Sequence, residues 1–418
     1  MRSSRPGMCF CLSLVASACG PKTTNEATDG PGTDPTTDAP ATPGTTGDCP
    51  TRCGDTTLST TSSCGDGEPC DPPTTGDGCD TACPVVPFEL LVPGVMPRAV
   101  AVAPDGWIVT GGSQTTPTIA PWFARISVSG EAVWTETPAD ADIGSSVQAL
   151  VVDDDGLIHA AGGTTYDDSS GAAWFARLDA SGATHDAASF VIGDYTRAEG
   201  VALGPGPAWY IGGEAGTYSA WVRRLDAAAT VAWTWQEPDA SAFALAVDPA
   251  GDAFAAGVVY GGQGAVWKID ATGQTVWKRE QPTPWLELAV DASGALYVGG
   301  SETTDTGLDL WVAKLAPDGA ELWRDTFAQI AGASPSDTAG ALALAPDGTL
   351  FFATQALWQG SQLHAFDPDD GASTWSAPPE LRWRWESVAV LSSGDPVVVG
   401  WDEAGPTATG IVRAYDLP

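Results

Sequence analysis

Short apolar runs separated by Gly-containing turns fill the chain after residue 95, and they repeat one phrase seven times. In each copy an apolar run ends at a turn such as Asp-Gly, a second run ends near Gly-Gly, and a third run carries Trp. Self-similarity at a period of 20–50 residues indicates a repeat architecture. The ends of the second runs, spaced 43 to 54 residues apart, are Gly112, Gly163, Gly213, Gly257, Gly300, Thr354 and Gly400.

Each unit contains four short β-strand candidates. In the fifth unit they span 288–290, 295–298, 310–315 and 320–324, and they are rich in Val, Leu, Trp and Tyr. The turns between them have the composition of β-hairpin turns, and no stretch sustains helical spacing of apolar residues. Four-stranded units of this length, repeated radially, are typical of a β-propeller. We therefore predict an all-β, seven-bladed β-propeller over residues 84–418.

The two ends of the repeat region predict how the propeller closes. The last unit stops at Gly410–Leu417, which matches the third strand of the other units, so its fourth strand is missing. An unassigned apolar run, Phe88–Val92, precedes the first unit. If this N-terminal strand pairs beside the C-terminal one, it completes the seventh blade and removes an open sheet edge.

The first 18 residues have the features of a secretory signal peptide. Arg2 and Arg5 precede an apolar stretch, Met8–Ala18, which is too short to span a bilayer. Small residues then lead into Cys19, and this phrase resembles the lipobox of bacterial lipoproteins. The resemblance implies lipidation of Cys19 and anchoring at the bacterial outer membrane or cell surface. Ordinary cleavage and release is the alternative.

Two further segments precede the propeller. Residues 19–48 are dominated by Thr, Pro, Gly and Asp, so we expect a disordered linker. Residues 49–83 hold six cysteines, which in an exported chain predict disulfides, with zinc binding as the alternative. The stretch 64–83 resembles a myxobacterial-type cysteine-rich repeat. The six residues are Cys49, Cys53, Cys64, Cys70, Cys79 and Cys83.

The net charge of the chain is −35. Residues 1–83 carry −7 of it, which leaves −28 for residues 84–418. This excess repels phosphate backbones, so we exclude nucleic acid as a partner and expect a soluble, monomeric propeller.

Tryptophans recur near the ends of the units, at Trp134, Trp233, Trp277, Trp323 and Trp375. The phrases that begin at Lys268 and Lys314 resemble the tryptophan-docking phrase of pyrroloquinoline-quinone propellers, which implies a quinoprotein dehydrogenase. That family places a vicinal disulfide over its cofactor, and this chain has no Cys after residue 83. We therefore expect the tryptophans to pack at the seams between blades and expect no cofactor.

Residues 87–418 resemble the exported seven-bladed β-propeller repeat and its pyrroloquinoline-quinone-like relatives. The resemblance implies a surface binding or scaffold domain without shared chemistry. The matching phrases span 99–112, 149–163, 288–300 and 341–354.

Loop lengths indicate where a ligand would bind. The connections between second and third strands and the links between units are long and dissimilar, and alternating strand direction brings both sets to one face. Recognition residues concentrate in such loops. We expect this face to bind a protein, a peptide or a glycan. The candidate ligand residues are Tyr166, Asp167, Asp168, Tyr218, Tyr260, Trp285, Trp358 and Trp401.

No catalytic or metal-binding motif is evident in the sequence. The three histidines, His159, His185 and His364, lack metal-ligand spacing, and we predict no catalytic and no metal-ligating residue. The Asp-rich turns 153–156 and 367–371 resemble fragments of calcium loops, although Asp and Gly also favour turns. Two alternatives to a binding protein stay open, namely an extracellular polysaccharide lyase or hydrolase and a purely structural envelope spacer.

Overall fold

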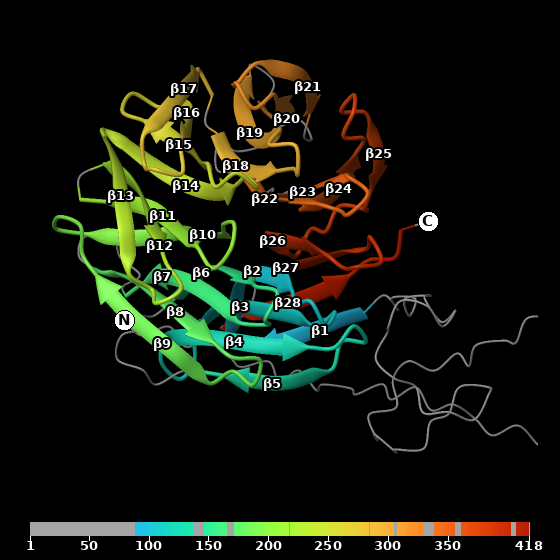
Figure 1. Cartoon of the computed structure of the whole chain (residues 1–418). Coiled ribbons are helices and arrows are strands. Elements are labelled where there is room, and N and C mark those ends of the chain that lie inside the picture. Colours follow the sequence, from blue (N-terminus) through green and yellow to red (C-terminus); the bar gives the residue numbers. More distant parts are fainter. Residues whose placement is uncertain are drawn as a thin grey trace, which may run out of the picture. The chain divides into compact units, whose positions relative to one another are not determined.

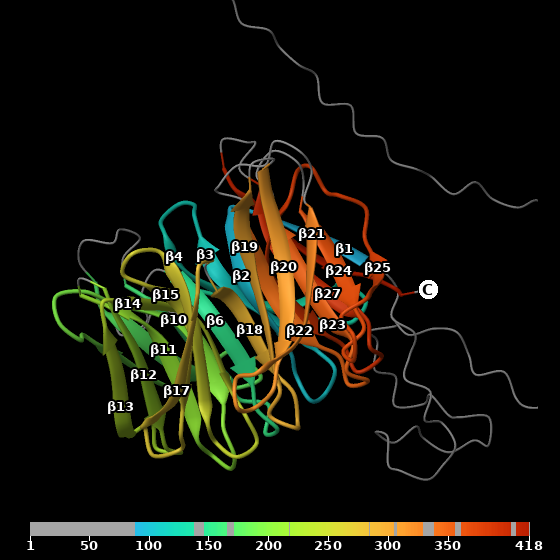
Figure 2. The same cartoon turned by 90° about the horizontal axis from the view of Figure 1, so that it is seen from above.

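Short apolar runs and Gly-containing turns fold the described part of the chain into strands alone. The computed structural model describes residues 88–137, 146–164, 171–216, 218–283, 285–304, 307–328, 338–355, 361–402 and 407–417. Within these residues 28 strands form seven four-stranded antiparallel sheets. The sheets stand as blades around a central axis, as seen face-on in Figure 1 and from the side in Figure 2. The predicted seven-bladed β-propeller is confirmed.

The strands of each blade follow one another from the axis outward, except in the last blade. Blade 1 consists of β2 (Val95–Val102), β3 (Ile108–Gln114), β4 (Ala120–Ile126) and β5 (Ala132–Glu136). Blade 2 consists of β6 (Ser146–Val152), β7 (Ile158–Gly163), β8 (Ala173–Leu178) and β9 (Thr184–Phe190). Blade 3 consists of β10 (Thr196–Leu203), β11 (Trp209–Ala215), β12 (Ser219–Leu225) and β13 (Val231–Pro238). Blade 4 consists of β14 (Ala240–Val247), β15 (Ala253–Val259), β16 (Gln263–Ile269) and β17 (Thr275–Gln281). Blade 5 consists of β18 (Trp285–Val290), β19 (Leu296–Thr304), β20 (Gly307–Leu315) and β21 (Glu321–Ala328). Blade 6 consists of β22 (Thr338–Leu344), β23 (Leu350–Gln355), β24 (Gln362–Phe366) and β25 (Ser373–Ser376).

Blade 7 is completed by both ends of the repeat region. It contains β26 (Arg384–Val390), β27 (Pro396–Asp402) and β28 (Thr409–Ala414), and β1 (Phe88–Pro93) pairs with β28 as its outer strand. The antiparallel register runs from Phe88 opposite Ala414 to Pro93 opposite Thr409. The predicted closure by an N-terminal strand is therefore confirmed, and β1 covers the edge of β28 that would otherwise be open.

Tryptophans hold neighbouring blades together, as the sequence predicts. The indole N–H of Trp134 donates a hydrogen bond to the carbonyl oxygen of Ala180 in the next blade, at 3.0 Å. Trp233, Trp277 and Trp323 make the same bond to the corresponding turn of the following blade, at 3.0 to 3.1 Å. Each bond satisfies the only polar atom of a large apolar plate that covers the seam.

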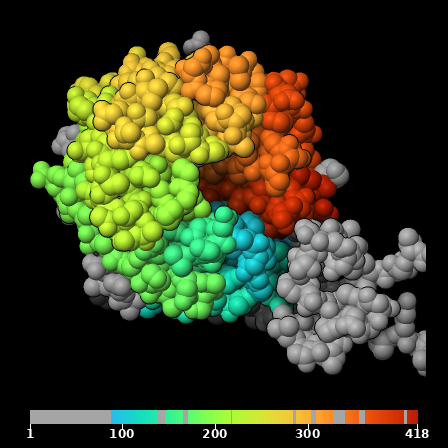
Figure 3. Space-filling view, viewed as in Figure 1, coloured from blue at the N-terminus to red at the C-terminus, as the bar shows by residue number. Residues whose placement is uncertain are grey.

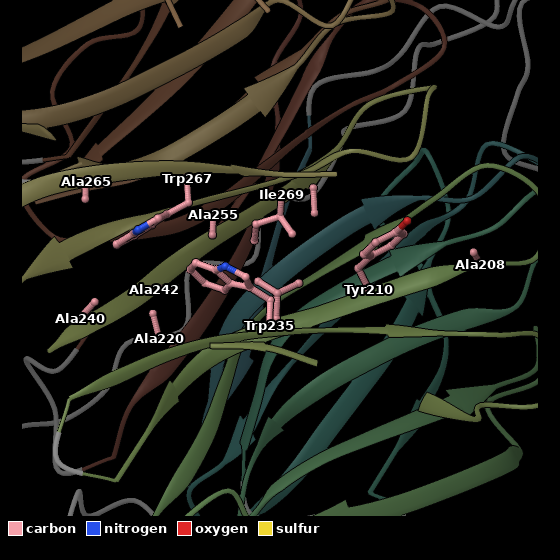
Figure 4. Close-up of a cluster of buried hydrophobic side chains, with 12 residues drawn as sticks. Ala208, Tyr210, Ala220, Trp235, Ala240, Ala242, Ala255, Ala265, Trp267 and Ile269 are labelled. Atoms are coloured by element: carbon pink, nitrogen blue, oxygen red, sulfur yellow. The ribbon is translucent and has the colours of Figure 1, made fainter. Parts of the chain in front are cut away.

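The remaining core also lies between blades rather than within them. Figure 4 shows the cluster between blades 3 and 4, which contains Trp235 and Trp267. The centroids of their rings lie 5.8 Å apart, and the angle between the ring planes is 61°. Small residues such as Ala220 and Ala255 surround them and allow the two sheets to approach closely. Stability therefore depends on the packing of successive blades, as in other repeat folds.

The seam between blades 2 and 3 departs from the tryptophan pattern. Asp186 takes the position that Trp134 occupies in blade 1, opposite Arg177. Arg177 forms an ion pair with Asp186 and donates to the carbonyl oxygen of Ala227 in blade 3. The turn that receives this contact has Ala229 at a positive φ of 58°, where other blades have Gly. A polar pair therefore replaces the aromatic plate at this one seam.

The strand register corrects one of the residues that the sequence pattern assigned to the end of a second run. Gly162, not Gly163, corresponds to Gly112, because each lies opposite the bulge of its inner strand. A Cβ at Gly112 would lie 2.1 Å from the carbonyl oxygen of Met96, and one at Gly162 would lie 1.9 Å from that of Ser146. At both positions the missing side chain of glycine permits this close approach of two strands.

Candidate binding site

Hydrogen bonds confirm that the blade-to-blade links and the second-to-third-strand loops share one face, which we call the long-loop face. Gly94, in the link before blade 1, bonds through its N–H to Ala408 of blade 7 and through its carbonyl to Thr115 of blade 1, both at 2.8 Å. In the link before blade 3, the carbonyl oxygen of Tyr195 likewise accepts a hydrogen bond from the N–H of Gly216 in the β11–β12 loop. The loops are thus tied to a rigid frame.

Two candidate ligand residues project from this face. Tyr218 lies in the β11–β12 loop and is 57% exposed, and Tyr260 lies in the β15–β16 loop and is 80% exposed. Their backbones bond to consecutive residues of one link, because Ala240 N–H donates to the Tyr218 carbonyl and Tyr260 N–H donates to the Asp239 carbonyl. Tyr218 and Asp239 both have positive φ, 62° and 56°. Strained backbone of this kind often marks a functional site.

The other candidates lie elsewhere. Trp285 begins β18, and its side chain is outside the described residues. Trp401 belongs to β27 rather than to the loop predicted from residue 401, and it is buried, with its N–H donating to Glu386 Oε1 at 2.8 Å. Outside the described residues lie Tyr166, Asp167, Asp168 and Trp358.

A pocket of about 230 Å³ occupies the central channel, where Figure 3 shows a hollow between the blades. It is lined by the inner strands of all seven blades. Each inner strand has a β-bulge at the same register, close to its long-loop end. β-Bulges re-aim side chains and are common beside functional sites. The residues at the seven bulges are Arg98, Gln148, Glu199, Phe243, Leu286, Gly340 and Glu386.

Two of the bulge glutamates pair with arginines at matching positions. Glu199 Oε1 lies 2.8 Å from Arg197 Nε in blade 3, and Glu386 Oε1 lies 3.1 Å from Arg384 Nε in blade 7. Both pairs have the pattern Arg-x-Glu in the sequence. Arg98 Nη1 approaches Glu386 Oε2 at 3.9 Å. The charges of Glu199 and Glu386 are therefore neutralised locally.

A third glutamate, Glu287, lines the same pocket. The surrounding protein raises the pKa of its carboxyl well above the ordinary value of 4.5, and the carboxylates of Glu386 and Glu199 raise it further. Desolvation and like charges both disfavour the ionised form. The seven strands that line this pocket are distant in the chain, so the repeat pattern does not predict it, although Glu287 is an exception among the aligned repeats.

His159, His364 and Asp153 of the first Asp-rich turn make local hydrogen bonds. His159 Nε2 lies 2.8 Å from Asp153 Oδ2, while Asp153 Oδ1 accepts from the N–H groups of Asp155 and Leu157. His364 Nδ1 lies 2.8 Å from the Ser376 hydroxyl. Within the described ranges, no three His, Cys, Asp or Glu side chains are placed to hold a metal ion.

The segments predicted upstream of the propeller lie outside the described residues. They include the signal peptide (residues 1–18), Cys19, the linker and the six cysteines of residues 49–83. No helix in the described part of the chain is long and apolar enough to cross a membrane.

Comparisons with known proteins identify the fold but no family. No protein-family model matches the chain, and no curated protein matches it. The solved structure of the RRP9 WD40 repeats matches with a TM-score of 0.55 at 15% identity, over 78% of this chain and 97% of that one. The structure of U3-55K matches with a TM-score of 0.54 at 16% identity, over 78% of this chain and 98% of that one. The Neurospora crassa Pan2 WD40 domain matches with a TM-score of 0.53 at 12% identity, over 77% of this chain and 90% of that one. The chain thus shares the β-propeller fold of these WD40 structures.

Proposed function

We propose that the protein is an exported lipoprotein of the bacterial outer membrane or cell surface, whose propeller binds a protein, peptide or glycan on its long-loop face. In this proposal Cys19 carries the lipid, residues 19–48 form a tether, and disulfides stabilise residues 49–83. These N-terminal features rest on the sequence pattern. The acidic surface keeps the propeller soluble and repels nucleic acid.

The observation that carries the binding role is the pair Tyr218 and Tyr260. Both rings project into solvent, yet both backbones bond to the same link, Asp239–Ala240. A tyrosine held on a rigid frame offers a large contact area at low entropic cost, because few of its torsions must be fixed on binding. It can also stack on a sugar or donate a hydrogen bond.

Binding explains the site better than polymer cleavage does. A hydrolase or lyase would need acidic residues together with His or Tyr where the channel opens. Glu199, Glu287 and Glu386 line the channel pocket, but the described lining contains neither His nor Tyr. A purely structural spacer would not need two exposed tyrosines whose backbones bond to one link.

A binding screen tests this proposal. The fragment 84–418 and its Tyr218→Ala/Tyr260→Ala variant are offered glycan arrays and purified envelope proteins. As a matched control, Val276→Ala/Leu322→Ala removes two side chains of similar exposure, 54% and 58%, from the outer strands β17 and β21. We expect a ligand that binds the parent and the control but not the tyrosine variant. A ligand that binds all three equally would contradict the proposal, and so would the absence of any ligand.

A further inference from the structure

One position of the inner strands is occupied by a glutamate in blade 5 and by a small residue in every other blade. The position directly follows the bulge, and in blade 5 it is Glu287. The other six residues at this position are Ala99, Ala149, Gly200, Ala244, Ala341 and Ser387.

The packing of the inner strands accounts for the small residues. A Cβ added at Gly200 would lie 2.7 Å from the Cβ of Leu245 in the next blade, and the Ser387 hydroxyl lies 3.4 Å from Val100 N. The position thus faces the neighbouring inner strand at close range. A glutamate there is not required by packing, and its half-buried position in the channel disfavours the ionised form of its carboxyl.

Blade 6 has no bulge side chain to fill the pocket that Glu287 lines. Its bulge residue is Gly340, the only one of the seven without a side chain, and Gly340 lines the pocket together with Glu287. Phe243, the bulge residue of blade 4, lines the same pocket and is 36% exposed. The pocket therefore offers a carboxyl, an aromatic ring and free volume within one enclosure.

Glu287 has no cationic partner in the described part of the chain. Among the residues that the structure describes, none donates a hydrogen bond to its carboxyl or pairs with it. The charged groups that act on it are the carboxylates of Glu386 and Glu199, whereas Arg197 and Arg384 are engaged with those two glutamates. Arg98 lines the pocket and approaches Glu386 at 3.9 Å. A bound positive charge would neutralise Glu287, and it would satisfy an acid that otherwise has no described partner.

We propose that the channel pocket binds an ammonium group, with the Glu287 carboxylate as its ion-pair partner and the Phe243 ring as a cation–π contact. The group belongs either to a small organic amine or to a lysine side chain of a partner. A volume of about 230 Å³ suits either, and it lies below the roughly 300–1,000 Å³ of drug-sized sites. This inference is independent of the long-loop proposal, because it concerns the channel alone.

Binding of the ammonium group would release a proton from Glu287. The neutral acid cannot form the ion pair, so the affinity rises as the pH approaches and passes the raised pKa of Glu287. In Glu287→Gln the pH dependence disappears together with the affinity.

Calorimetric titration of the full chain tests the proposal, with butylamine, the peptide acetyl-Gly-Lys-Gly-amide and the neutral alcohol butanol as probes. We expect saturable binding of butylamine or of the peptide, no binding of butanol, and affinity weaker by about tenfold or more in Glu287→Gln. Glu131→Gln, which removes an exposed carboxylate of the outer turn in blade 1, is the control and should bind as the parent does.

The two probes separate the two sources. Binding of butylamine alone would identify a small amine as the ligand, and tighter binding of the peptide would identify a lysine side chain of a partner. The proposal is overturned if neither probe binds, if Glu287→Gln binds as well as the parent, or if Ca²⁺ binds through Glu287 and the amines do not. Thermal unfolding of the Glu287→Gln variant serves as the folding control. The binding result for this variant is used only if it unfolds cooperatively, as a folded protein does.

Discussion

Phe88 lies directly against Gly130 across the seam between blades 7 and 1. A Cβ added at Gly130 would come 2.6 Å from Phe88 Cδ2. At other seams the glycine of the same turn faces a tryptophan, as Gly273 faces Trp233. Phe88, supplied by the N-terminal strand, thus performs at the closing seam the packing that tryptophans perform elsewhere.

This contact predicts an unequal response to two similar substitutions. Gly130 and Gly106 have nearly the same φ, 84° and 82°, but a Cβ at Gly106 would meet nothing within 4 Å. Gly106→Ala should lower the free energy of unfolding by about 1–2 kcal/mol through backbone strain alone. Gly130→Ala should lower it by about 1–3 kcal/mol more, because it overpacks the seam. Urea denaturation of the two variants measures the difference, and equal losses would contradict the closing contact.

The stability of the propeller should respond to the protonation of Glu287. Its pKa is raised in the folded state, so between the unfolded value near 4.5 and the raised value the folded chain binds more protons than the unfolded chain. The free energy of unfolding contributed by this group therefore falls as the pH rises through that interval. Glu287→Gln should be more stable than the parent at neutral pH and equal to it below about pH 4.5. Denaturation at several pH values checks this, and a parent that is more stable at neutral pH would refute it.

The polar seam between blades 2 and 3 predicts an acid-sensitive contribution of the opposite sign. Burial tends to raise the pKa of Asp186, but the hydrogen bonds and charge of Arg177 hold it below the ordinary 3.8. The pair therefore stabilises the fold above that pH and loses its effect as the pH falls. Asp186→Ala should cost about 1–3 kcal/mol at neutral pH, because it leaves a largely buried Arg177 unpaired. Asp154→Ala, at an exposed turn position, should cost little, and a similar loss in both variants would count against the seam.

Lipidation is tested at Cys19. The parent chain should fractionate with membranes, and mass spectrometry of its N-terminal peptide should find a diacylglyceryl group on Cys19. Cys19→Ser should move the protein to the soluble fraction, because its acyl chains no longer anchor it. An unmodified N-terminus on protein recovered outside the membranes would rule out the anchor.

The repeat itself predicted most of the fold. The period gave seven blades, and the missing fourth strand after Gly410–Leu417 pointed to Phe88–Val92 as its replacement. Two details escaped because they depend on register: blade 2 has one more residue before its Gly-Gly, which shifted the anchor from Gly162 to Gly163, and Trp401 continues β27 instead of starting a loop.

The channel pocket could not be read from one repeat at a time. Its lining comes from seven strands that are each about one blade apart in the chain, and the bulges that orient it are set by backbone pairing. The one available signal was Glu287, which stands where the other units have Ala, Gly or Ser. The exposed tyrosines were predictable from loop length, whereas their attachment to Asp239–Ala240 required the structure.

Hydroxyl-radical footprinting of the propeller with and without its ligand tests the central claim, that the long-loop face is the binding surface. Tyr218 and Tyr260 are exposed in the free protein and should be oxidised readily. When the ligand is bound, their oxidation should fall severalfold while that of Val276 and Leu322 on the outer strands stays unchanged. Undiminished oxidation of both tyrosines in the saturated complex would place the ligand elsewhere and contradict the account.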